Sequence, residues 1–419
     1  MCENIFFGVP VTRFFNVSLV LIVLFSSSCS LAGSDSRSDD RVSENLDPQE
    51  SFSEVAWEWE ESSGSEVARV VPVSVGVAVL FEDGVTVLSG ESGEEIWSRR
   101  ETLEAVGIAG NGEFIVVETD EGLSMLDPGG GEVVHEVAGA EMEDQLLITS
   151  EQRLIWKPDS EASRGRLSAI SLEENTELWS GLEGLRCDSD PELPVYTGSA
   201  RLVGEVITLM YTCAEYSSNS EALAAGLDRV EENEVVSGII GIDSANGEEL
   251  WRFEEFIEGS VSHSYNRDVS RVSNNHLVVR TMGEGDVFLD ARNGEEIPGG
   301  TNVLASSDDL SWLVMRRGDG VFVRVGENME VEEVIDFSDL GEDLDQESGF
   351  IVLDDGLGFV SGSGSASEAV FRPWGGNIEE ARIGLENAVS EVNDVISAPG
   401  VIVVSYIDGE GRSVLIGLT

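Results

Sequence analysis

Basic residues are scarce in this chain. It has 24 lysines and arginines against 81 aspartates and glutamates, a formal net charge of -57 at pH 7, and Lys157 is the only lysine. A surface this negative repels nucleic acids and anionic lipid headgroups, so no nucleic-acid partner is expected. Adaptation to a saline setting outside the cytoplasm would account for the acidity, because salt screens the repulsion between like charges. A genome biased toward Glu and Gly would account for it equally well.

Residue types that carry out catalysis or hold metals are also rare. The three histidines are scattered and lack metal-ligand spacing: His135, His263 and His276. The sequence contains no Gly-x-Ser-x-Gly motif, no phosphate-binding loop and no paired-cysteine metal motif. The acidic run 336–347 could hold calcium through oxygen ligands, but without EF-hand spacing it fits a solvated loop better. We therefore predict no catalytic residue, no cofactor and no metal site.

The one strongly apolar run, VSLVLIVLF at 17–25, lies near the N-terminus. It is too short to span a bilayer as a helix and matches the apolar core of a secretory signal. Three serines and then Cys29 follow, which resembles a bacterial lipoprotein signal whose cysteine is lipidated. Ser26 stands where that signal usually has Leu, so a plain secretory signal remains the alternative.

The first 53 residues therefore predict export and anchoring. Residues 1–29 form the signal and end at the lipidated Cys29, and 30–53 form a disordered tether rich in Ser and acidic residues. The protein is expected outside the cytoplasm, held on the cell membrane by its lipid, or secreted if Cys29 is not used.

Residues 54–419 read as one array of short strands with no amphipathic helix. An apolar strand, an acidic-Gly turn, a second strand and a Gly- or Asn-containing corner recur, and each unit ends near Glu-apolar-Trp. Clear copies are VTVLSGESGEEIW (85–97), LSMLDPGGGEVVH (123–135), LSAISLEENTELW (167–179), IIGIDSANGEELW (239–251) and VFLDARNGEEIP (287–298). Weaker copies lie near 321–334, 367–382 and 412–419.

The spacing of these copies predicts the fold. One equivalent position in each unit gives Leu88, Leu126, Ile170, Ile242, Leu289, Val323, Phe371 and Leu415. A period near 45 residues with four short strands is the size of one propeller blade. The long third step, from Ile170 to Ile242, contains no second copy between 187 and 235, so it is one blade with an insertion. We predict an all-β, eight-bladed β-propeller of four-stranded antiparallel blades, with seven blades as the alternative.

The units resemble the quinoprotein alcohol dehydrogenase-like repeat, also called the PQQ-like repeat. The resemblance rests on Gly93-Glu94-Glu95-Ile96-Trp97 and on Asn246-Gly247-Glu248 followed by Trp251. It implies that the Trp of each outer strand packs between neighbouring blades: Trp57, Trp97, Trp179 and Trp251. His135 takes the Trp position in the second unit and Pro298 in the fifth, so their outer strands are less certain. The adjacent cysteine pair of true quinoprotein dehydrogenases is absent, which argues against a quinone site.

Two further predictions concern the ring and its cysteines. The last unit lacks an outer strand, and 53–60 looks like an unpaired one, so we expect it to complete the eighth blade and join the termini. Cys187 and Cys213 form an even pair in an oxidising compartment, which favours a disulfide over two buried thiols.

The predicted function is a non-catalytic binding scaffold. A monomeric propeller tethered outside the membrane would dock protein partners of the cell envelope through its loops, with the insertion between Cys213 and Val235 as the first candidate contact. This architecture resembles the propeller lipoprotein of the outer-membrane barrel-assembly machinery, a likeness of fold and anchor only. The alternatives are a quinone-dependent dehydrogenase, a hydrolase with a site at the propeller mouth, and an envelope sensor or sugar-binding module.

Overall fold

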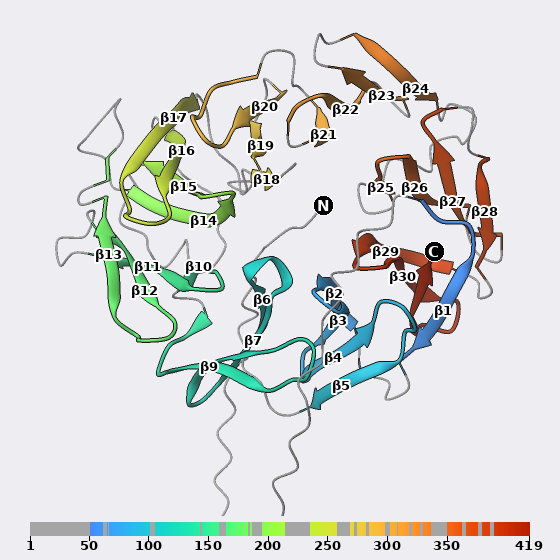
Figure 1. Ribbon diagram of the computed structural model, residues 1–419, viewed down its shortest axis with the longest axis horizontal. Coiled ribbons are helices and arrows are strands. Elements are labelled where there is room, and N and C mark those ends of the chain that lie inside the picture. Colours follow the sequence, from blue (N-terminus) through green and yellow to red (C-terminus); the bar gives the residue numbers. More distant parts are fainter. Residues whose placement is uncertain are drawn as a thin grey trace, which may run out of the picture.

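A computed structural model shows a ring of small β-sheets (Figure 1). It describes residues 51–61, 65, 67–100, 105–142, 145–158, 165–182, 185–186, 195–213, 235–257, 269–271, 275–281, 285–297, 302–307, 309–317, 321–326, 330–336, 350–362, 366–375, 379–385 and 389–419. Within these ranges the chain forms eight antiparallel sheets, each following the last along the sequence. The protein is an eight-bladed β-propeller, as the repeat spacing predicts.

The first four blades each have four strands in chain order from the inside of the ring outward. Blade 1 contains β2 (Val67–Val73), β3 (Gly76–Phe81), β4 (Gly84–Ser89) and β5 (Glu95–Arg100). Blade 2 contains β6 (Ala105–Ala109), β7 (Phe114–Thr119), β8 (Gly122–Leu126) and β9 (Val133–Ala138), with a 3-10 turn at Gly110–Gly112. Blade 3 contains β10 (Gln145–Ile148), β11 (Gln152–Pro158), β12 (Gly165–Ser171) and β13 (Glu177–Gly181). Blade 4 contains β14 (Val195–Val203), β15 (Val206–Cys213), β16 (Val235–Asp243) and β17 (Glu249–Ile257).

The other blades follow the same plan with one exception. Blade 5 contains β18 (Val269–Arg271), β19 (His276–Thr281) and β20 (Gly285–Asp290). Blade 6 contains β21 (Val303–Ser306), β22 (Trp312–Arg316), β23 (Val321–Gly326) and β24 (Val331–Asp336). Blade 7 contains β25 (Phe350–Val352), β26 (Gly356–Ser361), β27 (Glu368–Pro373) and β28 (Ala381–Gly384). Blade 8 contains β29 (Val389–Ala398), β30 (Val401–Asp408), β31 (Ser413–Leu418) and β1 (Val55–Glu60).

Blade 5 differs from the other blades in its described part. In its described part the sheet has three strands, and beyond β20 lies a single bridge between Leu289 and Glu296. The connection from Ile297 to β21, the first strand of blade 6, consists of residues 298–302. The shortest connections between other neighbouring blades, 101–104 and 385–388, are about as long. Pro298, which lies outside the described residues, has no backbone N–H to donate to a further strand.

Ring closure joins the two ends of the described chain. β1 pairs antiparallel with β31, with Trp57 opposite Gly417. The Ser53 and Glu54 amides donate to the Thr419 carbonyl at 2.8 and 3.0 Å, and the Thr419 amide donates back to Glu54 at 3.0 Å. Blade 8 is thus built from both ends of the array, which removes two free sheet edges.

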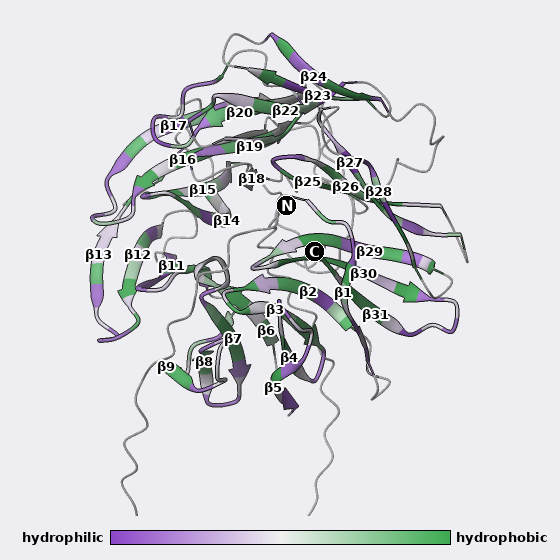
Figure 2. Ribbon diagram, turned by 45° about the vertical axis from the view of Figure 1, so that its right-hand side comes forward, coloured by the Kyte–Doolittle hydropathy of each residue, from purple (hydrophilic) through white to green (hydrophobic). Residues whose placement is uncertain are grey.

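The core lies between the blades, because each sheet packs both of its faces against neighbours. Middle strands such as β3 and β31 are buried along their whole length, and their sequences, GVAVLF and SVLIGL, are nearly all apolar. Outer strands such as β5 alternate between exposed and half-buried residues. Figure 2 shows the same division, with hydrophobic middle strands and hydrophilic segments on β5 and β13. Burial on two faces explains the continuous apolar runs that break the simple alternation of a one-sided sheet.

Candidate functional site

The turn between the third and fourth strands is the most regular feature of the array. In five blades the residue at one turn position has positive φ: Gly93 (66°), Gly131 (73°), Asn175 (51°), Gly247 (75°) and Gly294 (70°). The amide of that residue donates to the carbonyl four positions earlier, at 2.8 to 3.0 Å in all five turns. Residues in the left-handed region are favoured as Gly or Asn, which explains the Gly- or Asn-containing corner of each repeat.

Each predicted blade-packing tryptophan crosses a blade junction and lies on the next blade's turn. The indole N–H donates to a turn carbonyl three positions before the positive-φ glycine. The four bonds are Trp57 to Gly90 at 2.8 Å, Trp97 to Pro128 at 2.7 Å, Trp179 to Ser244 at 3.0 Å and Trp251 to Ala291 at 2.7 Å. The ring lies so close to the glycine that a Cβ there would approach it to 2.5, 2.8, 2.2 and 2.5 Å, respectively. These junctions, called docked junctions below, are 8/1, 1/2, 3/4 and 4/5.

The junction between blades 2 and 3 lacks this contact. His135 pairs with Met125 at the register position that the tryptophans occupy elsewhere, and its ring lies edge-on to Phe114 of its own blade. The receiving turn of blade 3 has Asn175 in place of Gly. The Asn175 side chain accepts a hydrogen bond from Arg153 at 3.1 Å. The position can hold a side chain because no indole covers it.

Two further junctions use other residues. At junction 6/7 the register places Glu333 in the tryptophan position, beside Gly375 of blade 7. Trp374 of blade 7 is buried there with Val314 and Phe322 of blade 6. Junction 7/8 is filled by Phe52, which is 3% exposed and whose ring centroid is 5.7 Å from that of Phe371. Phe52 belongs to the segment that the sequence assigned to the tether, because a single Phe among polar residues gives no strand signal.

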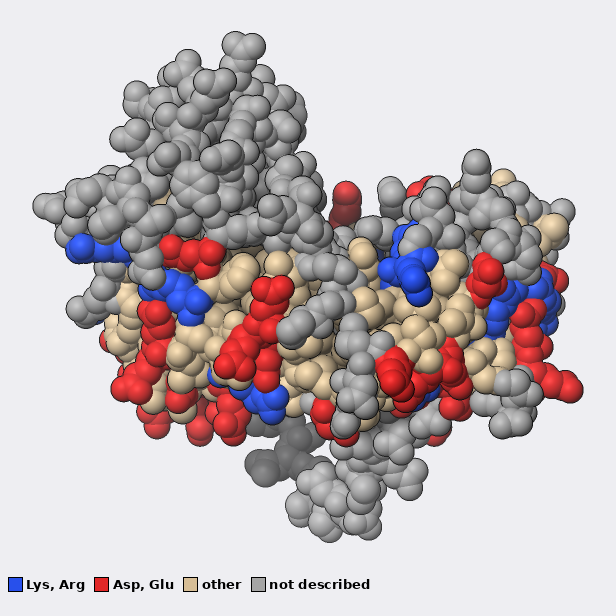
Figure 3. All heavy atoms as spheres, turned by 90° about the horizontal axis from the view of Figure 1, so that it is seen from above, with Lys and Arg blue, Asp and Glu red and all other residues tan. Residues whose placement is uncertain are grey.

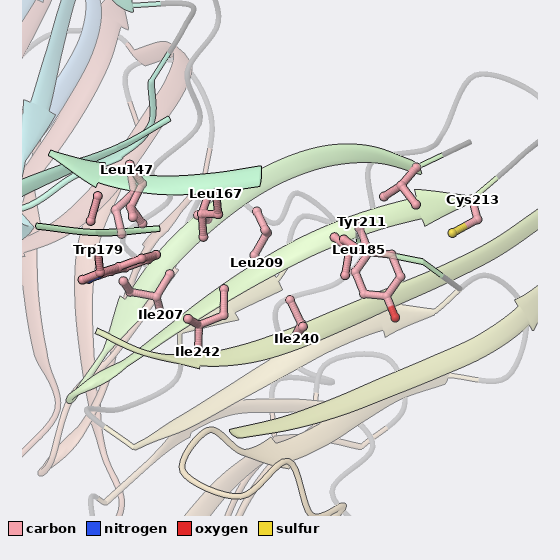
Figure 4. Close-up of a cluster of buried hydrophobic side chains, with 14 residues drawn as sticks. Leu147, Leu167, Trp179, Leu185, Ile207, Leu209, Tyr211, Cys213, Ile240 and Ile242 are labelled. Atoms are coloured by element: carbon pink, nitrogen blue, oxygen red, sulfur yellow. The ribbon is translucent and has the colours of Figure 1, made fainter. Parts of the chain in front are cut away.

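One cysteine of the predicted disulfide lies in the described part of the chain. Cys213 ends β15, is 0% exposed and belongs to the cluster that fills junction 3/4 (Figure 4). Cys187 and the lipidation candidate Cys29 lie outside the described residues, as does the insertion 214–234. The bridge and the anchor stay predictions.

The candidate metal-binding residues lie apart from one another in the described part of the chain. In the described ranges no three His, Cys, Asp or Glu side chains lie close enough together to hold a metal ion. His276 is fully buried next to Phe288, with ring centroids 5.6 Å apart, and His263 lies outside the described part. Of the acidic run 336–347 only Asp336 is described. No step of a redox reaction can be assigned to these residues.

Many arginines of the described surface neutralise carboxylates of their own blade. In blade 8, Arg412 contacts Asp408 and Glu60. The Arg412 backbone N–H, and then its guanidinium, lower the pKa of the Asp408 carboxyl. Blade 7 has a similar set, in which Arg382 binds Glu368 at 3.2 Å and Glu380 at 2.7 Å. In the side view of Figure 3 acidic side chains line one margin of the ring with basic ones among them.

The two faces of the ring differ in their connections. Strands alternate in direction, so connections from second to third strands and from blade to blade share one face, called the loop face. The other face, called the turn face, carries the remaining connections. The four long connections all join strand ends on the loop face: 182–194, 214–234, 258–268 and 337–349. β1 starts at the turn face, because it is a fourth strand and its first residue pairs with Leu418. The N-terminal segment therefore reaches the ring on the side opposite the long connections.

Comparison with known proteins gives no family for this chain. In the described part of the chain no helix is long and apolar enough to cross a membrane. No protein-family model and no curated protein matches the sequence.

Several solved structures are similar to this chain at low sequence identity. BamB from Moraxella catarrhalis shares 12% identity over 87% of this chain and 97% of its own, with a TM-score of 0.40. A quinohemoprotein alcohol dehydrogenase from Pseudomonas putida HK5 shares 10% over 90% and 78%, with a TM-score of 0.45. Sqt1 from Saccharomyces cerevisiae shares 11% over 88% and 99%, with a TM-score of 0.42. At this distance the likenesses say nothing about activity or partners.

Proposed function

We propose that this protein is a non-catalytic scaffold, tethered outside a bacterial membrane through lipidated Cys29, whose loop face binds protein partners of the cell envelope. The observation that carries the proposal is the position of the N-terminal segment. The chain joins the ring at the turn face, where Ser53 and Glu54 bond to Thr419. A tether that starts there leaves the opposite face, with its four long connections, directed away from the anchor.

The packing of the ring supports a scaffold. Docked junctions and a closed eighth blade hold the blades together in the ring that carries the long connections. Binding residues are commonly carried by loops that a rigid framework positions. A disulfide between Cys187 and Cys213 would join the connection 182–194 to the end of β15, next to the start of 214–234. In the chain-entropy model such a bridge contributes roughly 3 kcal/mol.

Crosslinking in native membranes tests the proposal. The wild-type chain should yield specific crosslinked proteins, and Cys29→Ser should release the protein from the membrane fraction. Replacing 216–232 by an equally long Gly-Ser segment should remove at least one crosslinked partner. The matched control is the same replacement within 337–349, which also lies on the loop face but belongs to junction 6/7. Unchanged partners with both replacements would exclude the loop face as the binding surface.

A further inference from the structure

The outer strand of blade 2, β9, exposes apolar side chains in an unusual arrangement. Val133 is 45% and Val134 is 46% exposed. They are the only two consecutive large apolar residues that are both exposed in the described part of the chain. The exposed apolar residues of β5, β13 and β17 occur singly in their strands. Single exposed apolar residues need no explanation, but adjacent ones on an edge strand mark a contact surface.

One edge of β9 belongs to no described ladder. The sheet order is β6-β7-β8-β9, so β9 pairs with β8 on one side and ends the sheet on the other. Proteins usually protect such edges with lysine, arginine, proline or closely spaced charges. β5 ends in Arg99 and Arg100, and β24 has Glu332 and Glu333 between its two exposed valines. β9 reads VVHEVA, with Glu136 as its only acidic or basic residue besides His135.

The charge around β9 has one sign. Between Arg100 and Arg153 the sequence has 13 acidic residues and no lysine or arginine. Glu132, which precedes the strand, and Glu136 within it are both exposed. Blade 7, by contrast, neutralises its outer strand with Arg382. A segment that binds at β9 must therefore bring its own positive charge.

We propose that β9 binds an extended segment of a partner protein, one that carries both apolar residues and Lys or Arg, as a fifth strand of blade 2. An added strand would pair with the backbone of the free edge. The added strand would bring apolar side chains beside Val133 and Val134 and basic side chains beside Glu132 and Glu136. Cross-strand pairs of apolar residues and of opposite charges both stabilise such an addition. This proposal deepens the binding function proposed above and rests on it.

A synthetic peptide of alternating Val and Arg, titrated into the full exported chain, tests the proposal. It should bind, and a Ser-Arg peptide of equal charge should bind at least about tenfold more weakly, a difference of about 1.4 kcal/mol. Val133→Lys/Val134→Lys should weaken binding of the Val-Arg peptide by a similar factor. Val331→Lys/Val334→Lys on β24 is the matched control, since it makes the same change on another outer strand, and it should leave binding unchanged. Equal binding of both peptides, or equal loss in both variants, overturns the proposal.

Hydrogen exchange of the wild-type chain gives a second measurement that needs no variant. The Val-Arg peptide should slow exchange in 133–138 and leave β24 unaffected; protection elsewhere, with none in β9, overturns the proposal. The Gly-Ser replacement of 216–232 separates the two proposals. Peptide binding that survives this replacement while crosslinked partners are lost supports both. Peptide binding with no effect of this replacement on the crosslinked partners supports β9 and contradicts 216–232 as the contact.

Discussion

Blade 3 meets its two neighbours through different contacts. Toward blade 4, Trp179 covers Gly247 and donates to Ser244, whose carbonyl also accepts a bond from Gln152 at 3.0 Å. Toward blade 2, the equivalent position holds His135, which contacts its own blade, and the receiving turn has Asn175. The same repeat thus supports a junction with an indole and one without.

The comparison shows that the turn residue depends on the neighbouring blade. All four turns that receive a tryptophan have Gly, and the turn that faces His135 has Asn. Asn tolerates positive φ, so backbone conformation alone does not require Gly. The indole removes the space for a Cβ, and this second requirement makes Gly necessary at docked junctions.

Removing the indole should have the largest effect. Trp179→Ala should destabilise the protein by about 3–5 kcal/mol, because it opens a cavity in the core and leaves the Ser244 carbonyl without its indole partner. His135→Ala, the control at the other side of the same blade, should cost about 1 kcal/mol or less. Urea unfolding followed by circular dichroism measures both. Equal losses of unfolding free energy in the two variants would show that the docked contact stabilises its junction no more than His135 stabilises junction 2/3.

Substitutions at the turn residues of junctions 3/4 and 2/3 should also differ in cost, by smaller amounts than the tryptophan and histidine substitutions. Gly247→Asn should cost about 2–3 kcal/mol, because the new Cβ would meet the Trp179 ring at 2.2 Å. Asn175→Gly should cost under about 1 kcal/mol, since it loses one exposed bond from Arg153 and gains a favourable φ. In a Trp179→Ala background the Gly247→Asn penalty should shrink. An unchanged cost in that background would mean that backbone conformation alone requires Gly247.

The docked contact should also be transferable to junction 2/3. His135→Trp combined with Asn175→Gly recreates the residue pair of the docked junctions, and we expect a gain of about 1 kcal/mol. His135→Trp alone should be neutral or destabilising, because Asn175 fills the space that the ring needs. The unfolding midpoints of both single variants and the double variant give the coupling energy. A coupling near zero would mean that junction 2/3 cannot accept an indole.

These contacts show what the sequence can reveal. The repeat period, the tryptophan positions and the unpaired segment that became β1 are visible because Gly-Glu-Glu-apolar-Trp recurs at 93–97 and 247–251 and partial copies mark other units. In the weaker copies the equivalent positions are harder to locate. Register makes Val325 and Leu418, not Val323 and Leu415, the counterparts of Leu88. The last repeat is split between the two ends of the chain, so its strand ending has no motif beside it.

The residues that replace the tryptophans could not be predicted. Glu333 takes that position because the turn before β24 is one residue shorter than in the docked blades, so the bulge that all these outer strands share falls at a different place in the repeat. Phe52 fills junction 7/8 through contacts with residues some 300 positions later in the chain, such as Phe371. Local sequence patterns identify the strands. The residues that replace a tryptophan at a junction depend instead on which two blades pack together.

The smallest expected effect concerns a charge at a docked junction. Asp394 lies at a bulge of β29, and its desolvation by burial raises the pKa of its carboxyl, although the Val395 amide and Arg69 of blade 1 partly oppose the shift. A carboxyl with a raised pKa in the folded state favours folding most when it is protonated. That contribution is full below about pH 4, the ordinary value of an aspartate, and is lost as the pH rises through the folded pKa.

Asp394→Asn should therefore stabilise the protein at pH 7, by about 1 kcal/mol, and have little effect below about pH 4. The asparagine oxygen can still accept the Val395 amide bond, which is 2.9 Å long. Glu391→Gln is the control, because it removes one negative charge from an exposed position of the same strand. Thermal unfolding from pH 3.5 to 8 measures both variants. If both raise the midpoint equally, the gain comes from the lower net charge of the whole protein, and the burial of Asp394 contributes nothing to the stability of junction 8/1.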